Sequence, residues 1–355
     1  MKKKRTLVAA LAAVTTSLSA QTVVTLTADR DAALYEDPTG QTANGAGTGL
    51  FVGITGQPKI RRTLLHFDLS SIPAGSRILS ATITTNTTLS STTTPLDTTW
   101  HRALADWTEG ASVAPGNGGG GTTALAGDAT WLHRSYPSVL WTNVGGDFDP
   151  NPSFTMPIQG AGLSGSGFQQ GLIDDLQTWL DNPPSNFGWL IKSDETLGPG
   201  TSKRFESRES SNGGVTLDVA YLTPGQVGEY GIGCTVNNQT MALGLTGPAS
   251  SGTTVNLDYV LAPASSIGAT FYALAIDYGP AGLGTPVFPP SCNVYLPANA
   301  IVPGNLWTTN ATGQASDTFA VPPNAPGFLV VCQGAALAAT PVGFTLSNAG
   351  VMLTN

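Results

Sequence analysis

The chain has 355 residues, of which 41% are apolar and only 11% are charged, together with 43 glycines and 25 prolines. A formal net charge of −8 offers no basic footprint, so we exclude nucleic acid as a partner. Thr- and Ser-rich runs of β-branched residues, punctuated by Gly and Pro, predict short strands joined by turns. The predicted fold class is all-β.

The N-terminus reads Met1-Lys-Lys-Lys-Arg5, then a short apolar run, then small residues before Gln21. This pattern predicts a secretory signal peptide over residues 1–20, cleaved near Ala20, and export to the extracellular space or the cell surface. The apolar run is too short to span a bilayer, and no later segment is long enough. Without the four basic residues of this leader, 11 basic residues remain against 23 acidic ones, a net charge of about −12.

Residues 21–222 alternate short strand-like runs with turn clusters, and the longest clean alternation runs from Arg77 to Thr88. Residues 166–180 differ, because their apolar side chains fall at helical spacing. Ser166 is suited to cap this helix, and Pro183-Pro184 to end it. We therefore expect one substantial helix lying over the predicted sheets.

Residues 223–228 have the composition of a linker, and the content of charged residues falls sharply after them. From Ser210 to Asn355 there is no Lys, Arg or His. Short strand-like runs continue, so we interpret residues 229–355 as a second, smaller β-sandwich.

The three cysteines, Cys234, Cys292 and Cys332, all lie late in the chain. An exported protein with three cysteines is expected to form one disulfide and keep one thiol. Cys332 ends the apolar run Phe328-Leu-Val-Val-Cys332, which predicts a buried strand in which Cys acts as a small apolar residue. We therefore predict a Cys234–Cys292 disulfide.

The segment Lys203-Arg-Phe-Glu-Ser-Arg-Glu209 concentrates charge in a chain that is otherwise poor in it. If it is a strand, Arg204, Glu206 and Arg208 share one face, and the two intervening side chains lie on the other.

Four pieces of residues 22–222 carry a resemblance to a known family: Arg62-Thr-Leu-Leu-His-Phe-Asp-Leu-Ser-Ser-Ile-Pro-Ala-Gly75 with Ser80-Ala-Thr-Ile83; Trp100-His-Arg102 with Asp106-Trp-Thr-Glu-Gly110; Thr130-Trp131 through Trp141 to Gly145-Gly-Asp-Phe148; and Phe187-Gly-Trp-Leu-Ile-Lys192 with the charged segment. Together they resemble the DNRLRE-type carbohydrate-binding domain, family 96 of such modules. The resemblance implies a jelly-roll-like β-sandwich on a secreted protein that binds a polysaccharide, acidic alginate-type glycans being the known example. The namesake string is not present, and Lys203–Glu209 is its nearest counterpart. Residues 229–355 are similar to a C-terminal sandwich of exported proteins from planctomycete-like bacteria, through Tyr230-Gly-Ile-Gly-Cys234 and Leu346-Ser-Asn-Ala-Gly350.

For the binding site, Arg204 and Arg208 would lie about 13 Å apart along a strand and could read separated acidic groups, with Glu206 holding them in place. Trp107 and Trp141 are the tryptophans expected to be exposed enough to stack on sugar rings. The alternatives are an intramolecular Arg–Glu ladder and tryptophans that fill a core.

Asp147, Asp149 and Asn151 alternate in a Gly-rich stretch and offer oxygen ligands of the kind that Ca²⁺ prefers. Calcium is the one cofactor that the sequence suggests. The alternative is a turn stabilised by the same side chains.

No catalytic motif is found among the residues, although a lyase-like use of His101, Arg102 and Tyr136 stays open. The sequence therefore predicts a secreted, non-catalytic protein that binds an acidic polysaccharide. The alternatives are a structural or adhesive surface protein without glycan recognition, and an undetected polysaccharide lyase or hydrolase.

Overall fold

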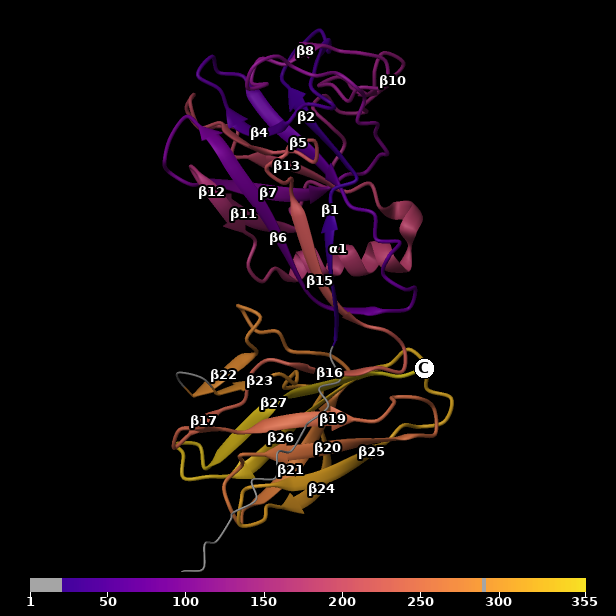
Figure 1. Cartoon of the computed structure of the whole chain (residues 1–355), viewed down its shortest axis with the longest axis vertical. Coiled ribbons are helices and arrows are strands. Elements are labelled where there is room, and N and C mark those ends of the chain that lie inside the picture. Colours follow the sequence, from indigo (N-terminus) through magenta and orange to yellow (C-terminus); the bar gives the residue numbers. More distant parts are fainter. Residues whose placement is uncertain (1–20, 289–291) are drawn as a thin grey trace, which may run out of the picture. The chain divides into compact units, whose positions relative to one another are not determined.

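The computed structural model describes residues 21–288 and 292–355, so the predicted signal peptide lies outside the described residues. Strands make up 44% of the structure and helix only 5%, which confirms the all-β prediction. The chain divides into two compact units (Figure 1). The first unit comprises Gln21–Pro224 and Ile276–Pro286, and the second comprises Gly225–Ala275 and Val287–Asn355.

The elements up to Pro224 are β1 (Thr22–Thr27), β2 (Arg30–Tyr35), β3 (Thr42–Ala43), β4 (Gly49–Ile54), β5 (Ile60–His66), β6 (Arg77–Ser90), β7 (Leu96–Arg102), β8 (Thr122–Thr123), β9 (His133–Ser135), β10 (Val139–Leu140), β11 (Phe154–Ile158), β12 (Gly162–Gly165), α1 (Gln170–Asp181), the 3₁₀ helix η1 (Pro183–Ser185), β13 (Trp189–Ser193), β14 (Lys203–Glu206) and β15 (Thr216–Leu222). Eleven of these strands form one antiparallel sheet in the order β1-β15-β6-β14-β4-β5-β13-β7-β11, with β12 on β6 and β2 on β5.

The sheet folds into the two layers of a β-sandwich, and strand β4 belongs to both layers. Its first residues, Gly49–Val52, pair with β14, whereas Gly53 and Ile54 pair with β5. Gly53 has a φ of +105°, and a Cβ there would lie 2.9 Å from the Cα of Ser202. Only glycine fits such a position, and it allows the sheet to change layer in mid-strand.

The main core of the first unit lies between the two layers and the helix. Strands on the β14 side contribute Leu50, Val52, Ile83, Phe205 and Leu217, strands on the β5 side contribute Leu65, Trp100, Met156, Trp189 and Ile191, and α1 contributes Leu172, Leu176 and Trp179. Each large apolar side chain buried in this way contributes roughly 1.5–3 kcal/mol to stability.

A second core covers the outer face of β5 and β13. It contains Leu64 and Leu190 from these strands and Trp107, Trp131 and Trp141 from the long connection between β7 and β11. Alternate residues of β5 therefore enter different cores, because successive side chains of a strand point to opposite faces. Both faces of this layer are consequently buried.

The predicted helix is present, but it begins later than expected. Gln169 occupies the N-cap position and makes no side-chain capping bond. Ser166, the predicted cap, instead accepts a hydrogen bond from the backbone N–H of Ile83. Pro183 follows the helix as predicted and opens η1. Within the described ranges, no helix is long and apolar enough to cross a membrane.

The elements after Pro224 are β16 (Val227–Tyr230), β17 (Thr235–Val236), β18 (Gln239–Thr240), β19 (Ala242–Thr246), β20 (Thr254–Val260), β21 (Ile267–Ala273), β22 (Thr285–Phe288), β23 (Cys292–Val294), β24 (Val302–Thr308), β25 (Ala315–Ala320), β26 (Leu329–Leu337) and β27 (Phe344–Leu353). In the second unit, the five-stranded sheet β16-β27-β26-β21-β24 faces the three-stranded sheet β19-β20-β25. Leu243, Leu257 and Tyr259 of the smaller sheet pack with Cys332 and Met352 of the larger one.

Candidate functional site

The charged segment forms β14 and the turn that follows it. Strand β14 pairs with β4 on one side and β6 on the other. Arg204 and Glu206 lie on the same face, as the alternation predicts, with Nη1 and Oε1 3.0 Å apart. The strand ends at Glu206, because the N–H of Arg208 donates to Asp31 Oδ2 (2.8 Å) instead of to a neighbouring strand. Arg208 therefore does not share the strand face of Arg204.

The guanidinium of Arg204 has five N–H donors, and protein acceptors occupy all of them. Nε donates to the carbonyl of Asn117 (3.0 Å), and Nη1 donates to Glu206 Oε1 and Thr88 Oγ1. Nη2 donates to both the carbonyl and the hydroxyl of Thr48, each at 3.0 Å. In this conformation no N–H of Arg204 is left for a ligand carboxylate.

Arg208 is also held by the protein. Its Nε and Nη2 contact the two carboxylate oxygens of Glu109 at 2.7 and 2.6 Å, and Nε lies 2.9 Å from Glu209 Oε1. The hydrogen bonds to Glu109 raise the pKa of Arg208. Both arginines therefore make the intramolecular ionic contacts that the sequence offered as the alternative to ligand binding.

A polar cavity of about 480 Å³ lies over Arg204, lined by Thr48, Thr88, Leu89, Asn117, Arg204, Glu206, Ser210, Ser211 and Asn212. An adjoining cavity of about 250 Å³ shares Leu89, Asn117 and Arg204 with it and extends to Ser90, Ser91 and Lys203. We call the two together the polar groove. Most of the hydroxyl and amide side chains on its rim are exposed, with Ser90 and Ser210 half-buried, and they are groups that form hydrogen bonds with sugar hydroxyls.

Two cations beside the polar groove make no ion pair within the described part of the chain. The ammonium of Lys203 is buried and donates to hydroxyl and carbonyl oxygens of Ser90–Thr94 at 2.6–3.2 Å. Arg61 donates to the carbonyl of Gly119 and lies over the ring of Tyr35. Burial lowers the pKa of both cations. Their direct contacts are neutral oxygens and a ring face, and Glu36 acts on Arg61 only from beyond ion-pair distance, so both cations favour an anion nearby.

The prediction that Trp107 and Trp141 are exposed is wrong. They are 1% and 6% exposed, because both lie in the second core under the β7–β11 connection. Their indole N–H groups donate to the carbonyls of Phe187 (2.9 Å) and Thr130 (3.0 Å), respectively. Neither ring presents a face on which a sugar could stack, so we withdraw both from the candidate binding residues.

The predicted cation ligands Asp147, Asp149 and Asn151 serve local structure. Asp147 accepts the backbone N–H groups of Thr142–Asn143 at 2.7–2.8 Å. Burial acts to raise the pKa of Asp147, but these donors outweigh it and hold the pKa below its usual value. Asp149 accepts from the N–H of Asn151 and pairs with Arg102 at 3.2 Å. These contacts correspond to the stabilised turn that the sequence left as the alternative.

The residues of the lyase-like alternative are engaged elsewhere. The ring nitrogens of His101 lie 2.8 Å from the carbonyl of Asp149 and 2.9 Å from Thr99 Oγ1. Burial lowers the pKa of His101. The ring of Tyr136 packs edge-on against His133.

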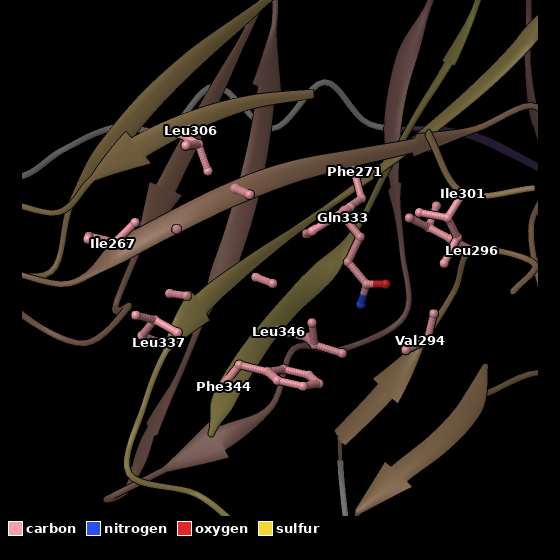
Figure 2. A pocket seen from close by; sticks show the side chains of 14 residues that line it. Ile267, Phe271, Val294, Leu296, Ile301, Leu306, Gln333, Leu337, Phe344 and Leu346 are labelled. Atoms are coloured by element: carbon pink, nitrogen blue, oxygen red, sulfur yellow. The ribbon is translucent and has the colours of Figure 1, made fainter. Parts of the chain in front are cut away.

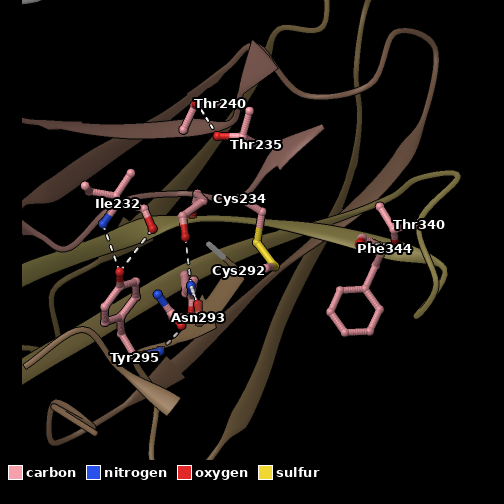
Figure 3. Close-up of a disulfide and its surroundings, with 11 residues drawn as sticks. Ile232, Cys234, Thr235, Thr240, Cys292, Asn293, Tyr295, Thr340 and Phe344 are labelled. Carbon is pink, nitrogen blue, oxygen red and sulfur yellow. Dashed lines mark hydrogen bonds between the residues drawn. A yellow bond between two sulfur atoms is a disulfide. The ribbon is translucent and has the colours of Figure 1, made fainter. Parts of the chain in front are cut away.

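The second unit contains the predicted disulfide between Cys234 and Cys292 (Figure 3). Beside it, the hydroxyl of Tyr295 bridges the backbone of Ile232, accepting from its N–H (2.9 Å) and donating to its carbonyl (3.0 Å). Cys332 is a buried thiol, and burial raises its pKa. The predicted pairing and the buried environment of Cys332 are confirmed.

An apolar pocket of about 400 Å³ lies over the larger sheet of the second unit (Figure 2). Leu306, Leu337 and Ile267 on its walls are 78%, 58% and 54% exposed. Gln333 is the polar side chain in the wall, and its amide already bonds to the carbonyls of Asn293 and Ser347. The pocket therefore presents an almost wholly apolar surface.

Sequence reasoning missed most of the polar groove, because Thr, Ser and Asn are abundant in this chain and carry no distinctive spacing. It also missed Asp31 and Glu109 as the partners of Arg208. The available signal for Asp31 was its position directly before the apolar run Ala32-Ala-Leu-Tyr35.

No protein-family model matches the chain, and none of the curated proteins is detectably similar to it.

Proposed function

We propose that this is an exported, non-catalytic carbohydrate-binding protein, and that the first unit binds an acidic, alginate-like polysaccharide in the polar groove. The observation that carries the proposal is the groove itself, whose rim is made of mostly exposed hydroxyl and amide side chains and whose wall contains Arg204 and Glu206. The resemblance of residues 22–222 to DNRLRE-type domains supports the same class of ligand.

The charge distribution favours an acidic glycan over a neutral one. Lys203 and Arg61 lie beside the groove without an acidic partner within 4 Å in the described chain. The positive charges of Lys203 and Arg61 would attract a uronate in the groove, and this attraction is stronger near a protein surface than in bulk water. This attraction is local and opposes the net negative charge of the chain, so binding weakens at high salt and strengthens if a divalent cation bridges protein and glycan.

Affinity electrophoresis of the full chain in gels containing alginate, pectin, a sulfated glycan or a neutral glucan tests the proposal. We expect retardation by acidic glycans that is reduced at least tenfold in affinity by the double variant Ser211→Ala, Asn212→Ala. Thr155→Val, on an outward-facing position of β11, is the matched control and keeps full retardation. The absence of retardation on every glycan, with and without calcium, would overturn the proposal. Release of unsaturated uronates, read by ultraviolet absorbance, would overturn its non-catalytic part.

A structural or adhesive role without glycan recognition is the second candidate. The hydrogen bonds of Arg204 favour this role, because all five N–H groups of its guanidinium already donate to other groups of the protein. Under this candidate no glycan retards the protein.

A further inference from the structure

Three carboxylates from distant parts of the sequence meet at one point of the first unit. Asp31 lies on β2, Glu109 in the connection after β7, and Glu209 in the turn after β14. One carboxylate oxygen of each lies within 4.8 Å of the others. Asp31 is fully buried, and the two glutamates are partly buried.

The contacts of this cluster leave one oxygen of a fully buried carboxylate without a partner. Asp31 Oδ2 accepts from the N–H of Arg208, and Glu209 Oε2 accepts from the hydroxyl of Ser207 (3.0 Å). Glu109 accepts from the N–H of Asp31 (2.8 Å) and from the guanidinium of Arg208. Glu209 Oε1 lies 2.9 Å from Arg208 Nε, whereas Asp31 Oδ1 has no hydrogen-bond partner among the described residues. Leaving a buried oxygen unsatisfied is unfavourable, and more so when the group is charged.

The charges of the cluster do not balance either. Three carboxylates face the single guanidinium of Arg208, which leaves two negative charges when all three are ionised. Burial raises the pKa of Asp31 well above its usual value and also raises that of Glu209. A divalent cation between the carboxylates would balance the charge and give Asp31 Oδ1 a partner.

We propose that Asp31, Glu109 and Glu209 form a calcium site. All the available ligand atoms are carboxylate oxygens, and such sites select hard cations over zinc or copper. Three oxygens this close can share one ion, and Ca²⁺ tolerates the irregular geometry that ligands from three separate segments impose, whereas Mg²⁺ demands a near-ideal octahedron.

The site would join three segments beside the polar groove. Glu209 directly precedes Ser210, Ser211 and Asn212 of the groove wall. Bound calcium would fix this turn to β2 and to the connection that carries Glu109. The site is independent of the proposed function, since it stabilises the fold whether or not a glycan binds.

Calcium titration of the chelator-treated full chain tests the site. We expect a dissociation constant of about 10⁻⁴–10⁻³ M, as for extracellular calcium modules. At one hundred times that concentration, the melting temperature of the first unit should rise by about 5–10 °C. Terbium should also bind, with emission sensitised by the nearby indole of Trp107. Asp31→Asn and Glu209→Gln should each weaken calcium binding at least tenfold, whereas the exposed Asp174→Asn should not.

Absence of a calcium-dependent melting shift and of terbium emission in the unmodified protein would overturn the proposal, and this result does not depend on whether the variants fold. Calcium binding that persists unchanged in both Asp31→Asn and Glu209→Gln would also overturn it. If calcium does not change the melting temperature of the unmodified protein, and Glu209→Gln melts at that same temperature, the proposal is overturned. The carboxylates of the cluster would then share a proton instead of a calcium ion.

Discussion

The two units hold their polar groups in different ways. All the ion pairs of the described residues lie between Asp29 and Glu209, and two of them, Arg62–Glu195 and Arg204–Glu206, are largely buried. The second unit has no Lys, Arg or His with which to make one. Its buried Asp317 is bound by neutral donors, namely Thr270 Oγ1, Asn305 Nδ2 and the N–H of Thr318. The second unit adds one disulfide to its apolar core.

This difference indicates where each kind of ligand is to be sought. Cations that can attract an acidic polymer are confined to the first unit, which also has the polar groove. The second unit has an apolar pocket and no cation of its own. The two units should therefore respond to different perturbations: the first to loss of a charge, the second to loss of its cross-link.

The largest expected effect is loss of the disulfide. Cys234 and Cys292 are 58 residues apart, and opening a loop of this length costs about 4 kcal/mol by chain entropy. Replacing both cysteines by serine should lower the unfolding free energy of the second unit by this amount in a denaturant titration. The transition of the first unit should not move. An equal loss in both transitions would contradict the independence of the two units.

Arg204→Ala should cost the first unit about 3 kcal/mol, because it leaves Glu206 buried without its charge partner. The double variant Arg204→Met, Glu206→Leu is the control, and it should recover most of this loss because it removes both charges. Denaturant titration measures both. If Arg204→Ala stays within about 0.5 kcal/mol of the parent protein, the pair does not hold the strand and the binding role of Arg204 regains support.

Trp107→Phe should destabilise the first unit by about 2 kcal/mol. It removes the hydrogen bond to the carbonyl of Phe187 and weakens the stacking of Arg30 on the indole, each worth about 1 kcal/mol. Thermal unfolding measures the loss, and glycan retardation should be unchanged in the folded variant. Reduced retardation at full stability would instead make this indole a ligand contact.

Asn151→Ala should have the smallest effect, within about 0.5 kcal/mol, because this exposed side chain lies in a surface turn. Calcium affinity should also be unchanged, since the proposed calcium site uses other residues. A tenfold loss of calcium affinity on this change would restore the cation site first expected at Asp147, Asp149 and Asn151.

Local patterns were enough to predict much of the fold. Alternation and turn residues predicted the strands, helical spacing predicted α1, and the buried run before Cys332 identified the disulfide partners by elimination. The side chains of Arg204 and Glu206 follow the strand period as expected.

Long-range packing was the part that the sequence could not reveal. Trp107 was expected to be exposed because Asp106 and Glu109 lie beside it before a glycine-rich loop, and Trp141 because it lies in a loop-rich stretch. In the structure the connection that carries them folds over β5 and β13, so the neighbours that matter are Leu64 and Leu190. The same is true of Arg208, since its partners Asp31 and Glu109 lie 177 and 99 residues away.

Isothermal titration of alginate oligosaccharides into the full chain, at 50 and 200 mM salt, is the most direct test of the central claim. Three forms should be compared: the unmodified protein, Ser211→Trp, which fills the polar groove, and the control Thr155→Val. We predict binding that weakens at the higher salt concentration, is abolished by Ser211→Trp and is kept in Thr155→Val. Undiminished binding in Ser211→Trp, or no binding by the unmodified protein at either salt concentration, would contradict the assignment of the polar groove as an acidic-glycan site.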